Sequence, residues 1–298
     1  MNIKVLRERV KVLGTNPLGR KSQLTFLPNA DSATNDHSHK AWLWQRTIHN
    51  RVCVSTIESS LAQRRPRRIV LVENSTALEI IEHITPLRWF GILGLTLNGL
   101  GWPPYFGRSY EFYEALHRSL ETTRQKVEWC TGANAVAFSH HDVFGGYSAF
   151  EPSHSPGLHI KISINYSGMG DYELCSNLPE DLHRLKDDMR AYTPGMPHGL
   201  YYLSSLGNAL CVWKHHSHIT WARTLKAQDA LEQFAKHRLV DCLGALAFIH
   251  PSRLLAGSVV SICGNHSSDL WLIRMIQSEL LDVEGKILKR ASALAPSP

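Results

Sequence analysis

The sequence predicts an α+β protein of two similar-sized domains, each with a small sheet and packed helices. Strand-like and helix-like segments recur in both halves of the chain, as is typical of this class. The 298 residues suit two domains, or one large one. A composition of 43% hydrophobic and 19% charged residues suffices for a buried core and excludes a disordered chain. We place the N-terminal domain at 1–126 and the C-terminal domain at 127–298.

The N-terminal half is dominated by strand patterns. Two helices are expected among the strands: Ser75 can cap a helix that runs to Leu87 with a bend at Pro86, and an apolar stripe predicts a helix over 111–121. Apolar and β-branched residues at strand-like spacing predict strands over 4–12, 22–27, 42–57, 68–72 and 91–100.

The C-terminal half contains the longer helices. Alternating apolar residues over 158–166 give the clearest strand of the chain. Further strands are expected over 206–213 and 258–262, and apolar residues at helical spacing predict helices over 178–189, 227–248 and 267–281.

Several classes of protein are excluded by motifs and composition. No apolar run approaches the roughly 18 residues of a membrane-spanning helix, and the N-terminus opens without an apolar signal core. The six cysteines are scattered singly, so we expect reduced thiols in a cytoplasmic protein. The phosphate-binding Gly-Lys-Ser/Thr, the dinucleotide Gly-x-Gly-x-x-Gly and the Gly-x-Ser-x-Gly elbow do not occur, which disfavours ATPases, simple dinucleotide enzymes and α/β-hydrolases.

The formal charge of +6 favours an anionic partner such as nucleic acid, an anionic lipid surface or a phosphorylated substrate. No nucleic-acid-binding motif accompanies the charge, so we expect no nucleic-acid partner. A solvated hairpin or turn is the simplest interpretation of the densest basic run, which is formed by Arg64, Arg65, Arg67 and Arg68 around Pro66.

Three places put histidine where it could carry chemistry. Glu82 and His83 are adjacent, so on a helix their side chains would point about 100° apart. His237 and Asp241 are spaced i, i+4 on one helix face, within reach of one zinc ion. His266 lies between a strand and a helix start. Taken singly, these also fit a surface dipeptide, a helix-surface ion pair and a histidine bonded to backbone.

Seven segments match, in order and rough spacing, the motifs of one enzyme family. They are 14–28 (a Gly-rich turn and strand), 47–53 (Asp-Thr-Arg-Leu-Cys), 82–83 (the end of Ser-Thr-Val-Glu-His), 190–195 (Ala-Arg-Thr-Phe-Gly), 206–209 (Leu-Asp-Asn-Ala), 237–244 (His-Lys-x-x-Asp-x-x-Gly) and 264–266 (Ser-Gly-His). The chain therefore resembles the zinc-dependent UDP-3-O-acyl-N-acetylglucosamine deacetylase family of lipid A biosynthesis (LpxC). Residues 54–59 also look like Ser-Thr-Val-Glu-His, but the strand after the motif aligns only when Glu82 and His83 are chosen.

This resemblance implies a zinc site between two domains, with His83, His237 and Asp241 as the metal ligands. Glu82 would be the general base that takes a proton from water. His266 would be the protonated partner that stabilises the oxyanion or protonates the leaving amine.

The resemblance also implies contacts with the substrate, a small anionic amino sugar such as a UDP-linked N-acetylglucosamine derivative that the enzyme deacetylates. Thr193 would offer its hydroxyl to the oxyanion. Arg238 takes the place of a lysine, Pro194 replaces a phenylalanine that faces the substrate, and Asn208 falls in the Leu-Asp-Asn-Ala motif. These three residues are expected to bind substrate.

Two departures from the family pattern leave alternatives open. Ala245 stands where the family has an aspartate that helps orient the histidine, so we expect His266 to be less easily protonated. The segment 193–208 is shorter than the family's acyl-chain passage. The alternatives are an LpxC-like zinc amidase that acts on a non-lipid N-acyl substrate, and a catalytically weakened paralogue that binds ligand without turnover. The oligomeric state is left open.

Overall fold

The computed structural model combines helices and strands in both halves of the chain, which confirms the α+β class. It describes residues 1–16, 19–29, 40–57, 61–65, 68–104, 106, 108–130, 138–141, 146–166, 170–192, 208–215 and 218–279.

The N-terminal half is built around a five-stranded sheet in the order β2-β3-β9-β4-β5. All neighbouring strands are antiparallel except β4 and β9. The helix α1 (Tyr110–His117) packs against β2. The strands of this half are β1 (Asn2–Leu6), β2 (Val10–Thr15), β3 (Lys21–Pro28), β4 (Leu43–Ile48), β5 (Arg51–Thr56), β6 (Ala62–Arg65), β7 (Arg68–Glu73), β8 (Thr76–Leu78), β9 (Leu95–Asn98) and β10 (Leu120–Lys126).

The C-terminal half has a second five-stranded sheet, in the order β12-β13-β19-β14-β15, and its described residues include three α-helices. The helices are α2 (Leu182–Asp188), α3 (Ala227–Leu246) and α4 (His266–Glu279). The strands are β11 (Trp129–Cys130), β12 (Phe138–His141), β13 (Tyr147–Pro152), β14 (Leu158–Tyr166), β15 (Gly170–Leu178), β16 (Asn208–His215), β17 (His218–Lys226), β18 (Leu254–Leu255) and β19 (Gly257–Ile262).

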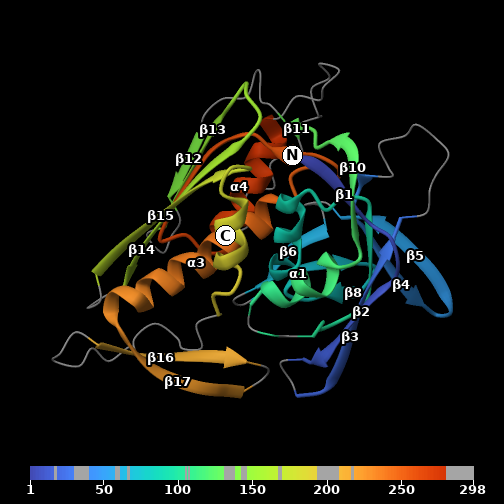
Figure 1. Ribbon diagram of the computed structural model, residues 1–298, viewed down its shortest axis with the longest axis horizontal. Coiled ribbons are helices and arrows are strands. Elements are labelled where there is room, and N and C mark those ends of the chain that lie inside the picture. The colour runs from blue at the N-terminus through green and yellow to red at the C-terminus, as the bar shows by residue number, and fades with distance from the viewer. Residues whose placement is uncertain are drawn as a thin grey trace.

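The helices lie between the two large sheets, and the β16–β17 hairpin lies below α3 in the view of Figure 1. Helix α3 packs on β14 and β15, and α4 packs on β13. Each sheet of the described residues takes its strands from one half, 1–126 or 127–298, whereas the buried apolar side chains of both halves form one continuous core. The division into two domains therefore stays a prediction.

The prediction of a helix that begins at Ser75 is wrong. Asn74 and Ser75 have φ angles of 48° and 62° and form the tight turn of the β7–β8 hairpin, which such left-handed pairs favour. Two 3₁₀-helices follow, η3 (Ile81–His83) and η4 (Thr85–Phe90). Pro86 is the second residue of η4, in the first turn, where proline is tolerated, and does not bend a longer helix. The other predicted helices are confirmed, but two of them are shorter than expected. The helix α1 ends at His117, ahead of strand β10, and α2 begins only at Leu182.

Contacts between α3 and the 3₁₀ segment hold the two halves together. The indole of Trp89 donates to the carbonyl of Leu243 at 2.8 Å, and the hydroxyl of Thr85 donates to that of Gly244 at 2.7 Å. A Cβ on Gly244 would lie 2.1 Å from the carbonyl oxygen of Glu82, so only glycine permits this approach. The 3₁₀ segment is thus fixed against α3 by backbone contact.

None of the helices in the described residues is both long and apolar enough to cross a membrane.

Candidate metal centre

His83, His237 and Asp241 lie together in a buried cluster that could hold a metal ion. One candidate ligand atom from each residue lies within 4.8 Å of the others. His83 comes from η3, and the i, i+4 spacing on α3 places His237 and Asp241 on one helix face. The Nε2 atoms of His83 and His237 each lie 3.4 Å from one oxygen of Asp241. The expected ligand set is therefore assembled from both halves of the chain.

The hydrogen bonding of the cluster suits a cation. The Nδ1 of His237 donates to the carbonyl of Ala191 at 3.3 Å, which leaves Nε2 with a free lone pair facing Asp241. The buried Oδ1 of Asp241 accepts no hydrogen bond of normal geometry from the described residues. Two imidazole nitrogens and a carboxylate oxygen are ordinary ligands of divalent transition metals.

The ionisation of the cluster points the same way. Burial lowers the pKa of His237 to about 4, so this imidazole is neutral at pH 7, as a metal ligand must be. Burial alone would raise the pKa of Asp241, but the imidazoles of His237, His83 and His266 outweigh it and hold that pKa below its usual value. The carboxylate is therefore ionised among the imidazoles.

Glu82 lies beside the cluster, and its carboxyl group can exchange a proton near neutral pH. It is 1% exposed, and its Oε2 accepts the backbone N–H of Ile69 on β7 at 3.0 Å. Burial raises the pKa of Glu82 to about 7, against the opposing charges of His266 and His83. A carboxyl group with a pKa near neutrality can both take and return a proton at pH 7.

The basic run contributes to the placement of Glu82. The expected hairpin is confirmed as β6–β7, yet two of its arginines are paired rather than merely solvated. Arg68 Nε lies 2.6 Å from one oxygen of Glu79, and Arg65 binds the other oxygen. Glu79 lies two residues before η3 begins at Ile81, so these ion pairs tie β6–β7 to the segment that carries Glu82.

His266 begins α4 and faces the cluster with its Nε2. Its Nε2 lies 4.0 Å from Glu82 Oε1 and 3.9 Å from Asp241 Oδ2. Burial would lower the pKa of His266, but Asp269, Asp241 and Glu82 outweigh it and raise that pKa to about 9. The expectation that His266 would be less easily protonated is wrong, because Asp269 supplies a carboxylate 3.8 Å from Nδ1. The His-x-x-Asp spacing on one helix was the sequence signal for Asp269, which the sequence analysis missed.

Arg238 is committed to a protein partner. Its Nη1 donates to Asp269 Oδ2 at 2.8 Å, its Nη2 donates to Asp269 Oδ1, and the guanidinium side chain is only 11% exposed. This pairing does not fit the expected role of Arg238 in binding a substrate anion, because the Asp269 carboxylate already neutralises its charge.

The other expected substrate contacts are not placed by the structure. Thr193 and Pro194 lie outside the described residues, and so does the side chain of Asn208, whose backbone begins β16. The alternative motif at 54–59 begins in β5, at the edge of the N-terminal sheet, where Val54 is 54% exposed. Of the two candidate motifs, the one that contains Glu82 and His83 lies beside His237 and Asp241 in the described residues.

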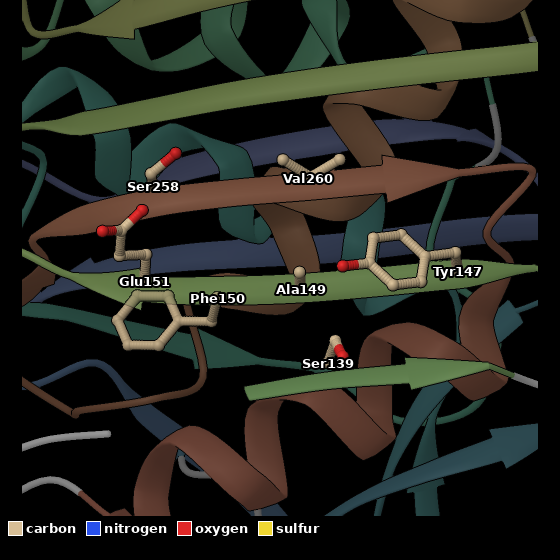
Figure 2. Close-up of a pocket in the computed structure, with 7 residues that line it drawn as sticks. All are labelled: Ser139, Tyr147, Ala149, Phe150, Glu151, Ser258 and Val260. Carbon is tan, nitrogen blue, oxygen red and sulfur yellow. The ribbon is translucent and has the colours of Figure 1, made fainter. Parts of the chain in front are cut away.

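A shallow hollow of about 300 Å³ lies elsewhere, on the C-terminal sheet. Figure 2 shows Tyr147 and Glu151 on β13 beside Ser258 and Val260 on β19. These four side chains alternate with buried neighbours on the same strands, so they stand on the face of the sheet away from the helices and the metal cluster. The hollow contains none of the candidate metal ligands or acid–base groups.

The chain matches no protein-family model, and no curated protein matches its sequence.

Proposed function

We propose that this protein is a zinc-dependent hydrolase that removes the acetyl group from an N-acetylated amino sugar. The observation that carries the proposal is the buried ligand set of His83, His237 and Asp241, flanked by Glu82 and His266. Two imidazole nitrogens and one carboxylate oxygen would hold a zinc ion and leave a position open for water, as is typical of catalytic zinc sites.

The two flanking groups have opposite protonation preferences, which assigns their roles. Glu82, with a pKa of about 7, would act as the base, and His266, with a pKa of about 9, would act as the acid. A zinc ion in the ligand set would supply Lewis acidity and lower the pKa of water toward about 7. Each acid–base role is typically worth about 10²–10⁴-fold in rate.

The proposed reaction balances with one water per amide. Glu82 takes a proton from the attacking water as the new C–O bond forms at the amide carbon. His266 donates the proton on Nε2 to the amine nitrogen as the C–N bond breaks. The products are acetic acid and the free amine, which exchange a proton to give acetate and the ammonium form, and transfer of the proton from Glu82 to His266 restores both groups.

For the substrate, a UDP-linked N-acetylglucosamine derivative of lipid A biosynthesis follows from the family resemblance. The pairing of Arg238 with Asp269 favours the second candidate, an amidase of the same type acting on a non-lipid N-acyl substrate, because it removes one expected contact with an anionic head group. The third candidate, a weakened paralogue, loses support because Asp269 supplies the carboxylate that Ala245 lacks.

Metal analysis of the purified protein, combined with substrate screening, tests the proposal. We expect close to one zinc per chain, its loss in His237→Ala, and its retention in the control His183→Ala, which changes an exposed histidine on α2. The zinc-loaded protein should release acetate from a panel of UDP-linked and free N-acetyl amino sugars. Absence of zinc after growth with added metal, or of acetate release across the panel, would overturn the corresponding part of the proposal.

A further inference from the structure

A buried ion pair lies directly behind His266. Arg238 on α3 binds Asp269 on α4 through both Nη atoms, and Asp269 is 1% exposed. The Nη2 of Arg238 also donates to the hydroxyl of Ser261 on β19 at 3.2 Å. The pair thus joins three elements at the base of the candidate site.

The surrounding backbone leaves this pair little freedom to move. A Cβ on Gly264 would lie 2.8 Å from Arg238 Nη2 and 2.2 Å from the Ser261 hydroxyl oxygen, so the loop before α4 closes tightly over the guanidinium. The backbone N–H of Asp269 donates to the carbonyl of Asn265 at 3.0 Å, which fixes the first turn of α4. Asp269 is therefore held from its backbone and from its side chain.

The imidazole of His266 stands between this carboxylate and the metal cluster. Its Nδ1 lies 3.8 Å from Asp269 Oδ2, while its Nε2 faces Glu82 and Asp241. The buried Nδ1 has no hydrogen-bond partner among the described residues. A small rotation of the ring would close the gap to a hydrogen bond, and such bonds are often long before substrate binds.

We propose that Asp269, clamped by Arg238, is the positioning residue that keeps a proton on Nδ1 of His266 and turns Nε2 toward the reacting amide. This inference rests on the proposed function for its consequence in catalysis, but the position of the proton can be measured without any substrate. Arg238 acts indirectly: it binds both carboxylate oxygens of Asp269 and so fixes the position of that carboxylate.

The test is ¹⁵N NMR of the histidine rings in the zinc-loaded protein, with the His266 signals assigned by their loss in His266→Gln. In the unaltered protein the Nδ1 of His266 should carry a proton. The double variant Arg238→Met/Asp269→Asn removes both buried charges together, so that neither is left uncompensated. We expect it to lose the Nδ1 proton, whereas the control Ser261→Ala, which leaves the Arg238–Asp269 pair intact, should keep it.

Two results would overturn the inference. One is a His266 ring with a bare Nδ1 in the unaltered protein, a result that needs no variant to fold. The other is an unchanged His266 spectrum in the folded double variant. If acetate release is found, the double variant should lose about 10²-fold or more in kcat with little change in KM. If no substrate is turned over by any form, the proposed reaction fails, but the spectra still decide the role of Asp269.

Discussion

Gly244→Ala tests whether the backbone contact between α3 and η3 sets the geometry of the metal centre. The added Cβ would lie 2.1 Å from the carbonyl oxygen of Glu82, 2.8 Å from its carbonyl carbon and 2.9 Å from its Cα. Comfortable separations between such atoms are about 3.5 Å. The two segments would therefore have to move apart by roughly 1 Å, and the obstructing atoms are backbone, which cannot turn aside.

Two effects of opposite sign decide the change in stability. Alanine gains about 1 kcal/mol over glycine inside a helix, while overpacking of a core costs about 1–3 kcal/mol. We expect the clash to prevail, so that the free energy of unfolding falls by up to about 2 kcal/mol. The metal centre should suffer more, because its ligand distances tolerate only about 0.2 Å and His83 moves with η3. Zinc affinity should fall about 10–100-fold or more.

Competition with a chromophoric chelator measures the zinc affinity, and urea unfolding measures the stability. Gln228→Ala, an exposed change on the same helix, serves as the control and should leave both quantities unchanged. A Gly244→Ala protein that is as stable as the unaltered chain and binds zinc equally well would refute the reasoning, since the contact would then have no influence on the site.

Four further outcomes are expected. If activity is found, its rate should rise with pH as Glu82 loses its proton and fall at higher pH as His266 loses its proton. Both limbs of the pH–rate profile should lie below the metal-free pKa values of about 7 and about 9, because a bound cation favours the ionised carboxylate and the neutral imidazole. Glu82→Gln should lose about 10²–10⁴-fold in kcat while keeping its zinc, and a rate equal to the unaltered enzyme would contradict its role as base. Arg88→Met should lower the free energy of unfolding, measured in urea, by about 3 kcal/mol or more. The reason is that the buried guanidinium donates to four backbone carbonyls that follow α3, those of Ala247, His250, Pro251 and Arg253. A smaller loss than in the exposed control Arg7→Ala would contradict this. Removing zinc with a chelator should lower the melting temperature of the unaltered protein and leave that of His237→Ala unchanged. Zinc at 1,000 times its Kd contributes about 4 kcal/mol to the free energy of unfolding, and the chelator removes this contribution.

Local periodicity was sufficient where one face of an element is buried and the other is not. Strand β14 was predicted because its isoleucines alternate with polar residues, and α3 because its apolar residues recur at helical spacing. The residues 78–90 are buried on every side, so their apolar pattern carries no period and was mistaken for an α-helix. Strand β10 is mostly exposed and polar and, within the described part of the chain, pairs with β1 alone, so it has no apolar face to indicate a strand.

The candidate ligands could be predicted to the extent that their spacing is local. The i, i+4 pair on α3 needs only a helix, and His83 was added by the resemblance. The partner of Arg238 could not be read in the same way, because Asp269 lies 31 positions further along the chain and meets it only when α4 packs on α3. An arginine beside a candidate metal ligand therefore suggested a substrate anion, whereas the fold pairs it with a carboxylate.

The charge of the buried centre provides an independent argument for a cation. Glu82, Asp241 and Asp269 are at most 6% exposed, and Arg238 is the fixed positive charge paired among them. Ionisation of all three carboxylates leaves an excess of negative charge even when His266 is protonated, and isolated buried charge is strongly unfavourable. Without a metal, this excess is relieved by a proton on Glu82, whose pKa is raised by burial, or on His83, where burial would lower the pKa but Asp241 outweighs it and raises it. A divalent ion between His83, His237 and Asp241 would remove the excess and free Glu82 to ionise. Zinc binding should therefore release a proton from Glu82, and calorimetry in buffers of different ionisation enthalpy should detect fewer protons released by Glu82→Gln.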